Sequence, residues 1–237
     1  MTQPNPAPVP LKALVTGASS GIGQAIAKRL TDQHITTALV SRSVQDLPPY
    51  GTAYPLDLSD LRHVKTKIQW ITETMHGIDI LINCAGMAYI GELITMPLED
   101  WQKLFDLNVT SLFQCIQGVL PTMRSQGAGT IINVASIAGK QGFPHWSAYC
   151  ASKFALLGMT QALAEEERSH GIRVMAICPG AVNTPIWDTL GDKVPASFNR
   201  QAMLQPETVA DAIWQMINLP ASAMITELVL MPSAGVF

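Results

Sequence analysis

The chain has 237 residues, of which 48% are hydrophobic and 14% charged, with a net charge of -3. This length suits one domain with a full core, and the small negative charge without a basic run argues against nucleic-acid binding. No apolar run reaches the roughly 18 residues that a transmembrane helix needs, so we expect no membrane partner and a cytoplasmic protein. The low fraction of charged residues leaves apolar surface to bury, which favours a homodimer or homotetramer.

The first residues and the cysteines carry little chemistry. Four prolines within residues 1–10 predict a flexible tail ahead of a single domain at 11–237. The four cysteines lie far apart without a C-x-x-C pair, which predicts free thiols and no metal site.

A glycine-rich turn follows the first predicted strand, 12–16. Residues 17–23 read GASSGIG and lead into a helical pattern at 24–33. Such a turn lets a diphosphate approach backbone N–H groups at the positive end of a helix. Because any tight turn between a strand and a helix uses glycine, the motif alone is weak evidence.

The second predicted strand, 35–40, ends at Ser41 and Arg42. In nucleotide-binding folds of this kind, an acidic residue here accepts the ribose hydroxyls of NAD, whereas an arginine suits the extra phosphate of NADP. With Ser41 in the acidic position and Arg42 beside it, the sequence favours NADP(H). The alternative for Arg42 is a solvated loop cation.

The third and fourth strands, 52–56 and 78–82, also end in residues suited to a ligand. Asp57 follows the third strand and has two possible roles, which are evenly supported. It either accepts a hydrogen bond from an adenine amino group or caps the next predicted helix, 60–75, and Ser59 competes for the capping role. The fourth strand ends in Asn83-Cys84-Ala85-Gly86, whose small residues leave room for a cofactor.

The residues of greatest chemical interest follow two predicted helices, 98–105 and 109–123. A strand at 130–135 ends at Ser136, and the next helix carries Tyr149 and Lys153 four residues apart, on one face. A cation beside a tyrosine favours the phenolate, so Lys153 is expected to lower the pKa of Tyr149, while Ser136 holds a substrate oxygen. Taken alone, Tyr-x-x-x-Lys is common and also fits an ordinary surface pair.

The last part of the chain continues the pattern in which each predicted strand is followed by a helix. A strand at 172–177 runs into residues 178–184, CPGAVNT, and an irregular segment at 185–205 rich in large apolar residues is expected to form a substrate lid. A helix at 206–218 and a strand at 224–231 follow. Strands and helices thus alternate throughout, which predicts an α/β fold, a Rossmann-type doubly wound parallel sheet of seven strands with ligands at the carboxyl ends.

From residue 11 to residue 231 the chain resembles the classical short-chain dehydrogenase/reductase family. Residues 16–23 match the glycine motif of that family, 83–86 its N-[NC]-A-G segment, and Pro179-Gly180 with Thr184 its cofactor-closing motif. The resemblance implies that Tyr149 is the general acid-base and that Lys153 lowers its pKa and binds the nicotinamide ribose. It further implies that Ser136 positions the substrate oxygen and that Asn108 holds a proton-relaying water.

The resemblance also implies a set of cofactor contacts. The glycine turn would line the diphosphate, Asp57 the adenine, and Val182 and Thr184 the nicotinamide amide, with Asn83 in the adjacent backbone framework. The full set of expected cofactor residues is Gly17, Ser19, Ser20, Gly21, Ile22, Gly23, Ser41, Arg42, Asp57, Leu58, Asn83, Ala85, Gly86, Tyr149, Lys153, Pro179, Gly180, Val182 and Thr184.

The expected function is therefore NADP(H)-dependent interconversion of a small-molecule carbonyl and its alcohol. One alternative is a 3-oxoacyl-carrier-protein reductase, for which Lys140, Lys193 and Arg200 would supply a thin basic surface. Another is an NADP(H)-sensing protein without turnover, against which stands the complete set of active-site residues. The residues expected to face the substrate are Met87, Ile137, Phe143, Trp146, Trp187 and Phe198.

Overall fold

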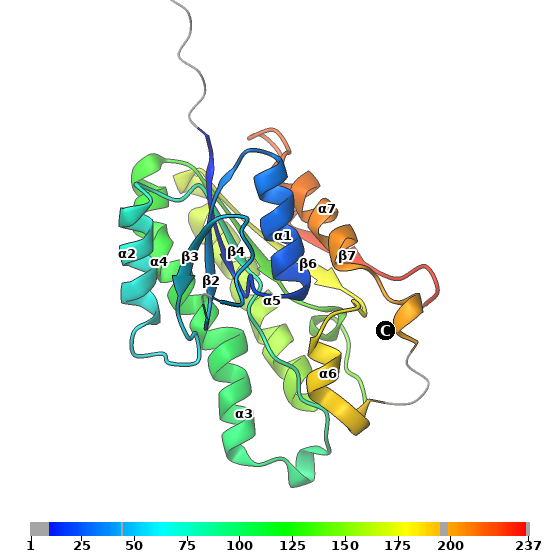
Figure 1. Ribbon diagram of the computed structural model, residues 1–237. Helices are drawn as coiled ribbons and strands as arrows, with labels where there is room; N and C mark the ends of the chain where they lie inside the picture. The colour runs from blue at the N-terminus through cyan, green and yellow to red at the C-terminus, as the bar shows by residue number, and fades with distance from the viewer. Residues whose placement is uncertain (1–9, 44, 195–198, 236–237) are drawn as a thin grey trace, which may run out of the picture.

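The computed structural model describes residues 10–43, 45–194 and 199–235, so most of the expected tail and Phe198 lie outside the described residues. Its strands form one parallel sheet in the order β3-β2-β1-β4-β5-β6-β7 (Figure 1). This confirms the predicted doubly wound α/β fold. The strands are β1 (Lys12–Thr16), β2 (Thr36–Ser41), β3 (Thr52–Pro55), β4 (Ile80–Asn83), β5 (Gly129–Val134), β6 (Ile172–Pro179) and β7 (Glu227–Leu230).

Helices cover both faces of the sheet. In Figure 1, α1 and α7 lie over one face and α2, α4 and α5 over the other, while α3 and α6 extend below the carboxyl ends of the strands. No helix in the described ranges is long and apolar enough to cross a bilayer. The helices are α1 (Gly21–Asp32), α2 (Val64–Thr74), α3 (Leu98–Phe105), α4 (Ser111–Gln126), α5 (Ser147–Glu167), α6 (Ile186–Leu190) and α7 (Pro206–Ile217).

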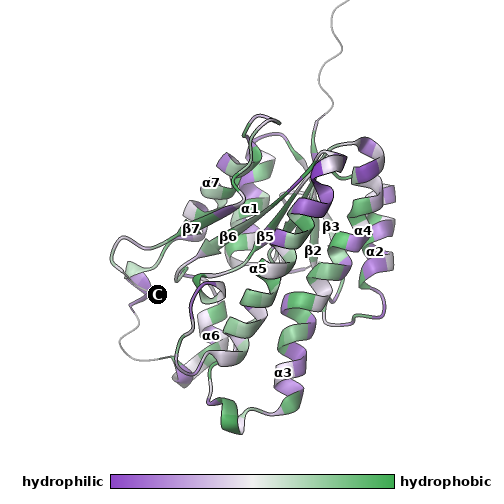
Figure 2. Ribbon diagram, turned by 180° about the vertical axis from the view of Figure 1, so that it is seen from behind, coloured by the Kyte–Doolittle hydropathy of each residue, from purple (hydrophilic) through white to green (hydrophobic). Residues whose placement is uncertain are grey.

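The core has two main halves, one on each side of the sheet. Successive strand side chains point to opposite faces, so Val15 packs with α1 and α7 while its neighbour Leu14 packs with α2 and α4. Such strands must be apolar on both faces, which explains their continuous apolar runs. In Figure 2 the middle strands are mainly green, and purple residues gather on the outer turns of the helices.

The predicted starts of two helices are wrong by three residues or more. Helix α1 begins at Gly21, three residues early, because the last part of the glycine turn is already helical. Helix α2 begins only at Val64, with His63 at its N-cap, so neither Asp57 nor Ser59 caps it. Asp57 Oδ1 instead accepts hydrogen bonds from Ser59 N and Oγ, at 2.9 and 2.7 Å, which holds the chain in a turn before the helix starts.

Helices α3 and α4 are joined without a loop. The π-helical turn Asp106–Thr110 connects them and carries Asn108, whose side chain is fully buried. A π turn inserts one residue into a helix and changes the direction of the side chains around it. It therefore lets Asn108 point inward between two amphipathic helices.

The segment expected to be irregular, at 185–205, contains regular structure in its described part. Helix α6 occupies Ile186–Leu190, short 3-10 turns follow at Gly191–Lys193 and Arg200–Ala202, and an isolated parallel bridge joins Val182 to Leu204. Pro185 at the N-cap of α6 has a φ already suited to the helix. The segment is thus a loop closed at its base.

Candidate active site

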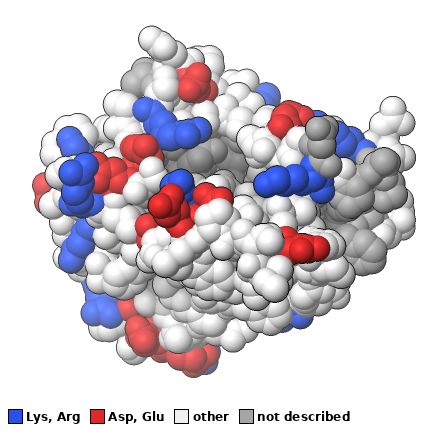
Figure 3. Space-filling view, turned by 90° about the horizontal axis from the view of Figure 1, so that it is seen from below, with Lys and Arg blue, Asp and Glu red and all other residues white. Residues whose placement is uncertain are grey.

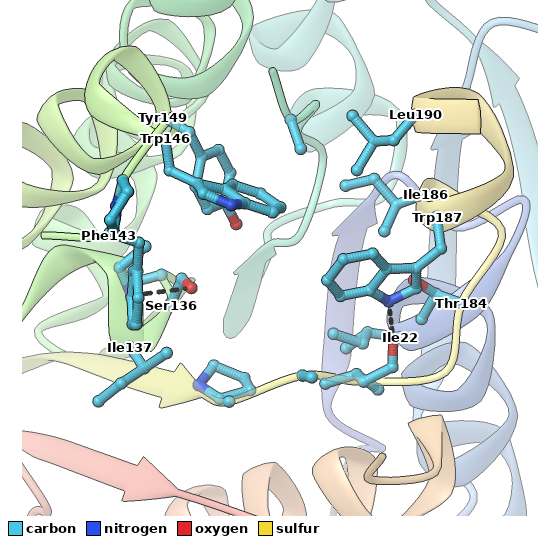
Figure 4. A pocket seen from close by; sticks show the side chains of 18 residues that line it. Ile22, Ser136, Ile137, Phe143, Trp146, Tyr149, Thr184, Ile186, Trp187 and Leu190 are labelled. Atoms are coloured by element: carbon cyan, nitrogen blue, oxygen red, sulfur yellow. Dashed lines mark hydrogen bonds between the residues drawn. The ribbon is translucent and has the colours of Figure 1, made fainter. Parts of the chain in front are cut away.

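A cavity of about 280 Å³ opens at the carboxyl ends of β5 and β6, between the first turn of α5 and helix α6. In Figure 4, Tyr149, Trp146, Ser136 and Phe143 lie on one side of it, and Ile186, Trp187 and Leu190 on the other. Seven of the lining residues belong to the predicted site, namely Ile22, Ser136, Tyr149, Pro179, Gly180, Val182 and Thr184.

Tyr149 and Ser136 meet in this cavity. Ser136 follows β5, and its Oγ accepts a 3.1 Å hydrogen bond from Ala138 N, which fixes the orientation of the hydroxyl. Desolvation of its hydroxyl raises the pKa of Tyr149 to about 12, and a hydrogen bond with the Ser136 side chain opposes that rise. At neutral pH the Tyr149 hydroxyl is therefore protonated.

Lys153 lies one helical turn after Tyr149, as expected, and only 5% of it is exposed. Its Nζ donates a 3.0 Å hydrogen bond to Val134 O and lies 5.7 Å from the centroid of the Tyr149 ring. Burial lowers the pKa of Lys153 to about 8. The net pKa of Tyr149 is thus raised and not lowered as expected, because burial of its hydroxyl outweighs every opposing interaction.

The Asn108 side chain forms hydrogen bonds with the loop after β4 and with helix α5. Its Oδ1 accepts from Met87 N at 2.8 Å, and its Nδ2 donates to Met87 O at 2.9 Å and to Ser152 Oγ at 3.1 Å. A Cβ added at Gly86 would lie 3.2 Å from Asn108 Oδ1 and 3.8 Å from Lys153 Nζ. The structure therefore brings together Gly86, Asn108 and Lys153, which are all among the expected site residues.

The glycine turn is packed tightly against the loop after β4. Gly17 has a φ of +67°, and a Cβ there would lie 2.9 Å from the Ala85 backbone, while one at Gly23 would lie 2.2 Å from Gly17 O. Thr16 Oγ1 accepts hydrogen bonds from Cys84 N and Ala85 N, at 3.1 and 3.2 Å. Thr16 was not among the expected cofactor residues, although its position at the end of β1, directly before the glycine, is a usable signal.

The N-terminus of α1 faces the open side of this turn. Its N-cap, Ser20, has an extended backbone and makes no capping hydrogen bond with its side chain. The first N–H groups of a helix lack partners within the helix and carry partial positive charge. Gly21 is the first residue of α1, and a Cβ added there would lie 2.9 Å from Thr184 Cγ2. The start of α1 and the segment that follows β6 therefore lie close together.

The side chain of Asn83 is buried between the sheet and helix α5 and does not line the cavity. Its Nδ2 donates to Asn133 Oδ1 at 2.9 Å, and Asn133 in turn donates to Thr160 Oγ1 at 2.8 Å. Asn83 Oδ1 is buried without a donor among the described residues. Asn83 thus acts on the sheet that carries the site.

The remaining predicted residues gather at the ends of β2 and β3. The glycine turn reaches them through a hydrogen bond from Ala18 N to Val40 O, and Leu56 N donates to Ser41 O at 2.8 Å. Arg42 is exposed, whereas the side chain of Leu58 is 5% exposed and belongs to the core. A contact from Leu58 to a ligand would therefore involve its backbone.

Metal-binding and thiol chemistry find no support at this site. Within the described ranges, no cluster of three or more His, Cys, Asp or Glu side chains could hold a metal ion. All four cysteines are free, and burial raises the pKa of Cys84 and Cys115 to about 12 and that of Cys178 to about 11. The thiols of Cys84, Cys115 and Cys178 are therefore protonated at neutral pH and poor nucleophiles.

Residues 11–195 match the family model of the short chain dehydrogenases. An uncharacterized oxidoreductase from Staphylococcus haemolyticus is 30% identical over 228 residues, which cover 93% of this chain and 96% of the relative. A 3-oxoacyl-[acyl-carrier-protein] reductase from Synechocystis is 35% identical over 226 residues, covering 90% and 92%.

Solved structures agree with this match. A variant of actinorhodin polyketide ketoreductase with NADPH superposes with a TM-score of 0.86 at 29% identity, over 96% of this chain and 98% of that one. The closed form of serine dehydrogenase complexed with NADP+ gives a TM-score of 0.85 at 27% identity, over 96% and 97%. The chain therefore belongs to the short-chain dehydrogenase family of oxidoreductases.

Proposed function

We propose that this chain is an NADP(H)-dependent enzyme that interconverts a carbonyl compound and an alcohol. The observation that carries the proposal is the pairing of the Tyr149 and Ser136 side chains in a mainly apolar cavity. Two hydroxyl groups directed at one region suit a substrate oxygen on which charge develops during reaction.

The residues around the glycine turn fit a dinucleotide. A side chain at Gly17 or Gly23 would collide with neighbouring backbone, so only glycine allows this compact turn, which is typical of dinucleotide-binding loops. The N-terminus of α1, which Ser20 leaves without a side-chain cap, suits a diphosphate. Ile22, Val182 and Thr184 would hold the nicotinamide, which supplies or accepts the hydride when bound.

Arg42 supports the choice of NADP(H) over NAD(H). It is exposed at the end of β2, next to the glycine turn, where a guanidinium can pair with the extra phosphate. Ser41, in the position of the usual acid, does not repel that phosphate. Several structural relatives bind NADP or NADPH, which agrees with this choice.

The proton chemistry belongs to Tyr149. In carbonyl reduction it gives its proton to the substrate oxygen, and its raised pKa keeps that proton available at neutral pH. Ser136 holds the same oxygen from the end of β5. Lys153 stabilises the phenolate that proton transfer leaves, because its positive charge lies one helical turn away. In this proposal, Asn108 holds the water that relays a proton through Lys153.

The walls of the cavity indicate a neutral and mainly apolar substrate. None of the described lining residues is charged, and Phe143, Trp146, Trp187 and Leu190 supply large apolar surfaces. A charged group placed there would lose hydration without gaining a partner. Small ketones and aldehydes, aromatic ones included, fit these walls.

The alternative of a 3-oxoacyl-carrier-protein reductase draws support from the Synechocystis relative. Such an enzyme needs free cations for an acidic carrier protein. Here Lys140 pairs with Glu227 at 2.8 Å, Arg200 pairs with Asp188, and Lys193 lies 5.0 Å from the centroid of the Tyr89 ring. Figure 3 shows positive and negative side chains mixed over the face below α3 and α6. This mixture favours small carbonyl compounds as substrates over a carrier-bound acyl chain.

The test is the rate of NADPH and NADH oxidation by the purified enzyme. The substrates would run from small diketones and aromatic aldehydes to 3-oxoacyl thioesters, with Tyr149→Phe as the control for the chemical step. Turnover of the small carbonyls with NADPH is expected. A strong preference for thioesters would move the assignment to the carrier-protein reductase, and tight NADPH binding without any turnover would favour a sensor.

A further inference from the structure

The guanidinium of Arg200 holds both the beginning and the middle of the segment that forms one wall of the cavity. Its Nε donates to Asn183 Oδ1 at 2.9 Å and its Nη2 to Thr184 O at 2.9 Å. Its Nη1 forms an ion pair with Asp188 in helix α6. Three acceptors on one planar group fix its orientation, which a flexible surface cation lacks.

The same stretch is also held through its backbone. Asn183 N donates to Leu204 O at 2.8 Å, and Leu204 N donates to Ala181 O at 3.0 Å, which closes the base of the loop. The Arg200 side chain adds a second closure beside the first. Asn183 is therefore held by both Leu204 and Arg200, and Thr184 is held by Arg200.

Thr184 is the residue through which this arrangement reaches the nucleotide site. Its methyl group lies against the glycine turn, since a Cβ on Gly21 would come within 2.9 Å of Thr184 Cγ2. A displacement of Thr184 by even a fraction of an ångström thus changes the gap between the end of β6 and the start of α1. That gap is where the proposed nicotinamide ligands Ile22, Val182 and Thr184 meet.

Helix α6 is held in the same way. Trp187 Nε1 donates to Val182 O at 2.7 Å, and its ring meets Trp146 edge-on, with centroids 6.0 Å apart. Figure 4 shows the Trp187 indole on the wall opposite Tyr149, with a dashed line to the backbone below it. Because Arg200 binds Asp188, the next residue, it also sets the position of this wall.

We propose that Arg200 is a positioning residue for the dinucleotide, which it serves by holding Thr184 and α6 against the glycine turn. This inference rests on the proposed function, because it concerns the cofactor of that reaction. Arg200 touches the part of the site that NADPH and NADH share, so it affects both nucleotides equally. Arg42, at the opposite end, distinguishes between them.

The experiment measures the dissociation constants of NADPH and NADH, without substrate, by tryptophan fluorescence. Arg200→Ala is expected to weaken both nucleotides by about tenfold, because it removes three charge-assisted hydrogen bonds. Arg200→Gln, which retains one amide donor, is expected to weaken both by a smaller factor. Arg168→Ala is the matched control, since Arg168 is an exposed arginine paired with Glu165 at the end of α5, and it should change neither constant.

A double-mutant cycle separates positioning from simple loss of stability. Asn183→Ala removes one acceptor of the guanidinium, and combining it with Arg200→Ala should weaken binding no further than Arg200→Ala alone. Thermal unfolding of Arg200→Ala should stay within a few degrees of wild type, because its partners lie at the surface.

Two results would overturn the inference while leaving the proposed function intact. Unchanged constants for both nucleotides in Arg200→Ala would show that the contacts of Arg200 do not position the site. A loss confined to NADPH would make Arg200 a phosphate ligand. Failure of the wild-type enzyme to bind either nucleotide would instead refute the proposed function.

Discussion

The ammonium group of Lys153 is directed at the carbonyl of Val134, at the end of β5, and not at the hydroxyl of Tyr149. The hydrogen bond measures 3.0 Å and lies in the interior, where burial lowers the pKa of Lys153 to about 8. The helix that carries Tyr149 is thereby anchored to the strand that precedes Ser136. The charge of Lys153 therefore changes within the pH range over which enzyme rates can be measured.

Carbonyl reduction is expected to slow as the pH rises above about 8. Lys153 loses its positive charge there, whereas Tyr149, with a pKa of about 12, keeps its proton. The proton donor thus persists, but the cation that stabilises the phenolate is lost. Measuring kcat/KM for carbonyl reduction from pH 6 to 10 checks this, and a value that rises through pH 8 would contradict it.

Lys153→Arg provides the control for that pH profile. An arginine stays charged over the whole range, so whatever activity the variant retains should not fall above pH 8. A fall of the same size in the variant would assign the titration to another group.

Tyr149→Phe is expected to lower kcat by at least about 100-fold, since the variant has no proton to give to the substrate oxygen. The Kd for NADPH should stay close to that of wild type. Single-turnover rates together with fluorescence titration measure the two quantities separately. Normal turnover in this variant would refute the proposed proton donor.

Arg42→Ala is expected to weaken NADPH by about 10- to 100-fold, the usual range for the loss of a hydrogen bond between charged groups. NADH, which lacks the extra phosphate, should bind as before. Arg62→Ala is a suitable control, because Arg62 is an exposed arginine that already pairs with Asp60 at 2.8 Å. Equal losses for both nucleotides would show that Arg42 does not bind the phosphate.

Two glycine substitutions test the packing of the helices. A Cβ at Gly118, on α4, would lie 2.5 Å from Ile68 Cγ2 on α2, so Gly118→Ala is expected to cost about 1–3 kcal/mol of stability. Gly158 is an exposed residue of α5 with no neighbour within 4 Å of the added Cβ. Gly158→Ala should therefore gain up to about 1 kcal/mol from helix propensity.

Thermal unfolding measures both effects, at about 2–4 °C for each kcal/mol in a chain of this size. A lower Tm for Gly118→Ala and a higher one for Gly158→Ala are expected. The same direction of change in both would show that the space around Gly118 does not decide the outcome.

The strands could be predicted because each is a short apolar run that ends at small or polar residues, as β4 does at Asn83 and β5 just before Ser136. Their parallel order follows from the helices between them. Strand β7 is shorter than predicted, at Glu227–Leu230, because the apolar residues Met224 and Ile225 pack on the core from outside the strand. Apolar character alone does not mark where a strand begins.

Helix α6 and the contacts of Arg200 could not be predicted from local patterns. Five residues are too few for a helix to form on its own propensity, and α6 is held by tertiary contacts such as that of Trp187 with Val182. The raised pKa of Tyr149 depends in the same way on the walls around it, which come from distant parts of the chain. The homo-oligomer stays a prediction.

Strands β4 and β5 meet mainly through isoleucine and leucine residues, and such apolar contacts alone would let the strands slide past each other at little cost. Asn83 lies directly opposite Asn133, and the two amides share a buried hydrogen bond. A slip by one residue would turn the two side chains to opposite faces and leave their polar groups stranded in the core. This pair therefore specifies the alignment of the two strands, from whose carboxyl ends the chain continues to Gly86 and to Ser136.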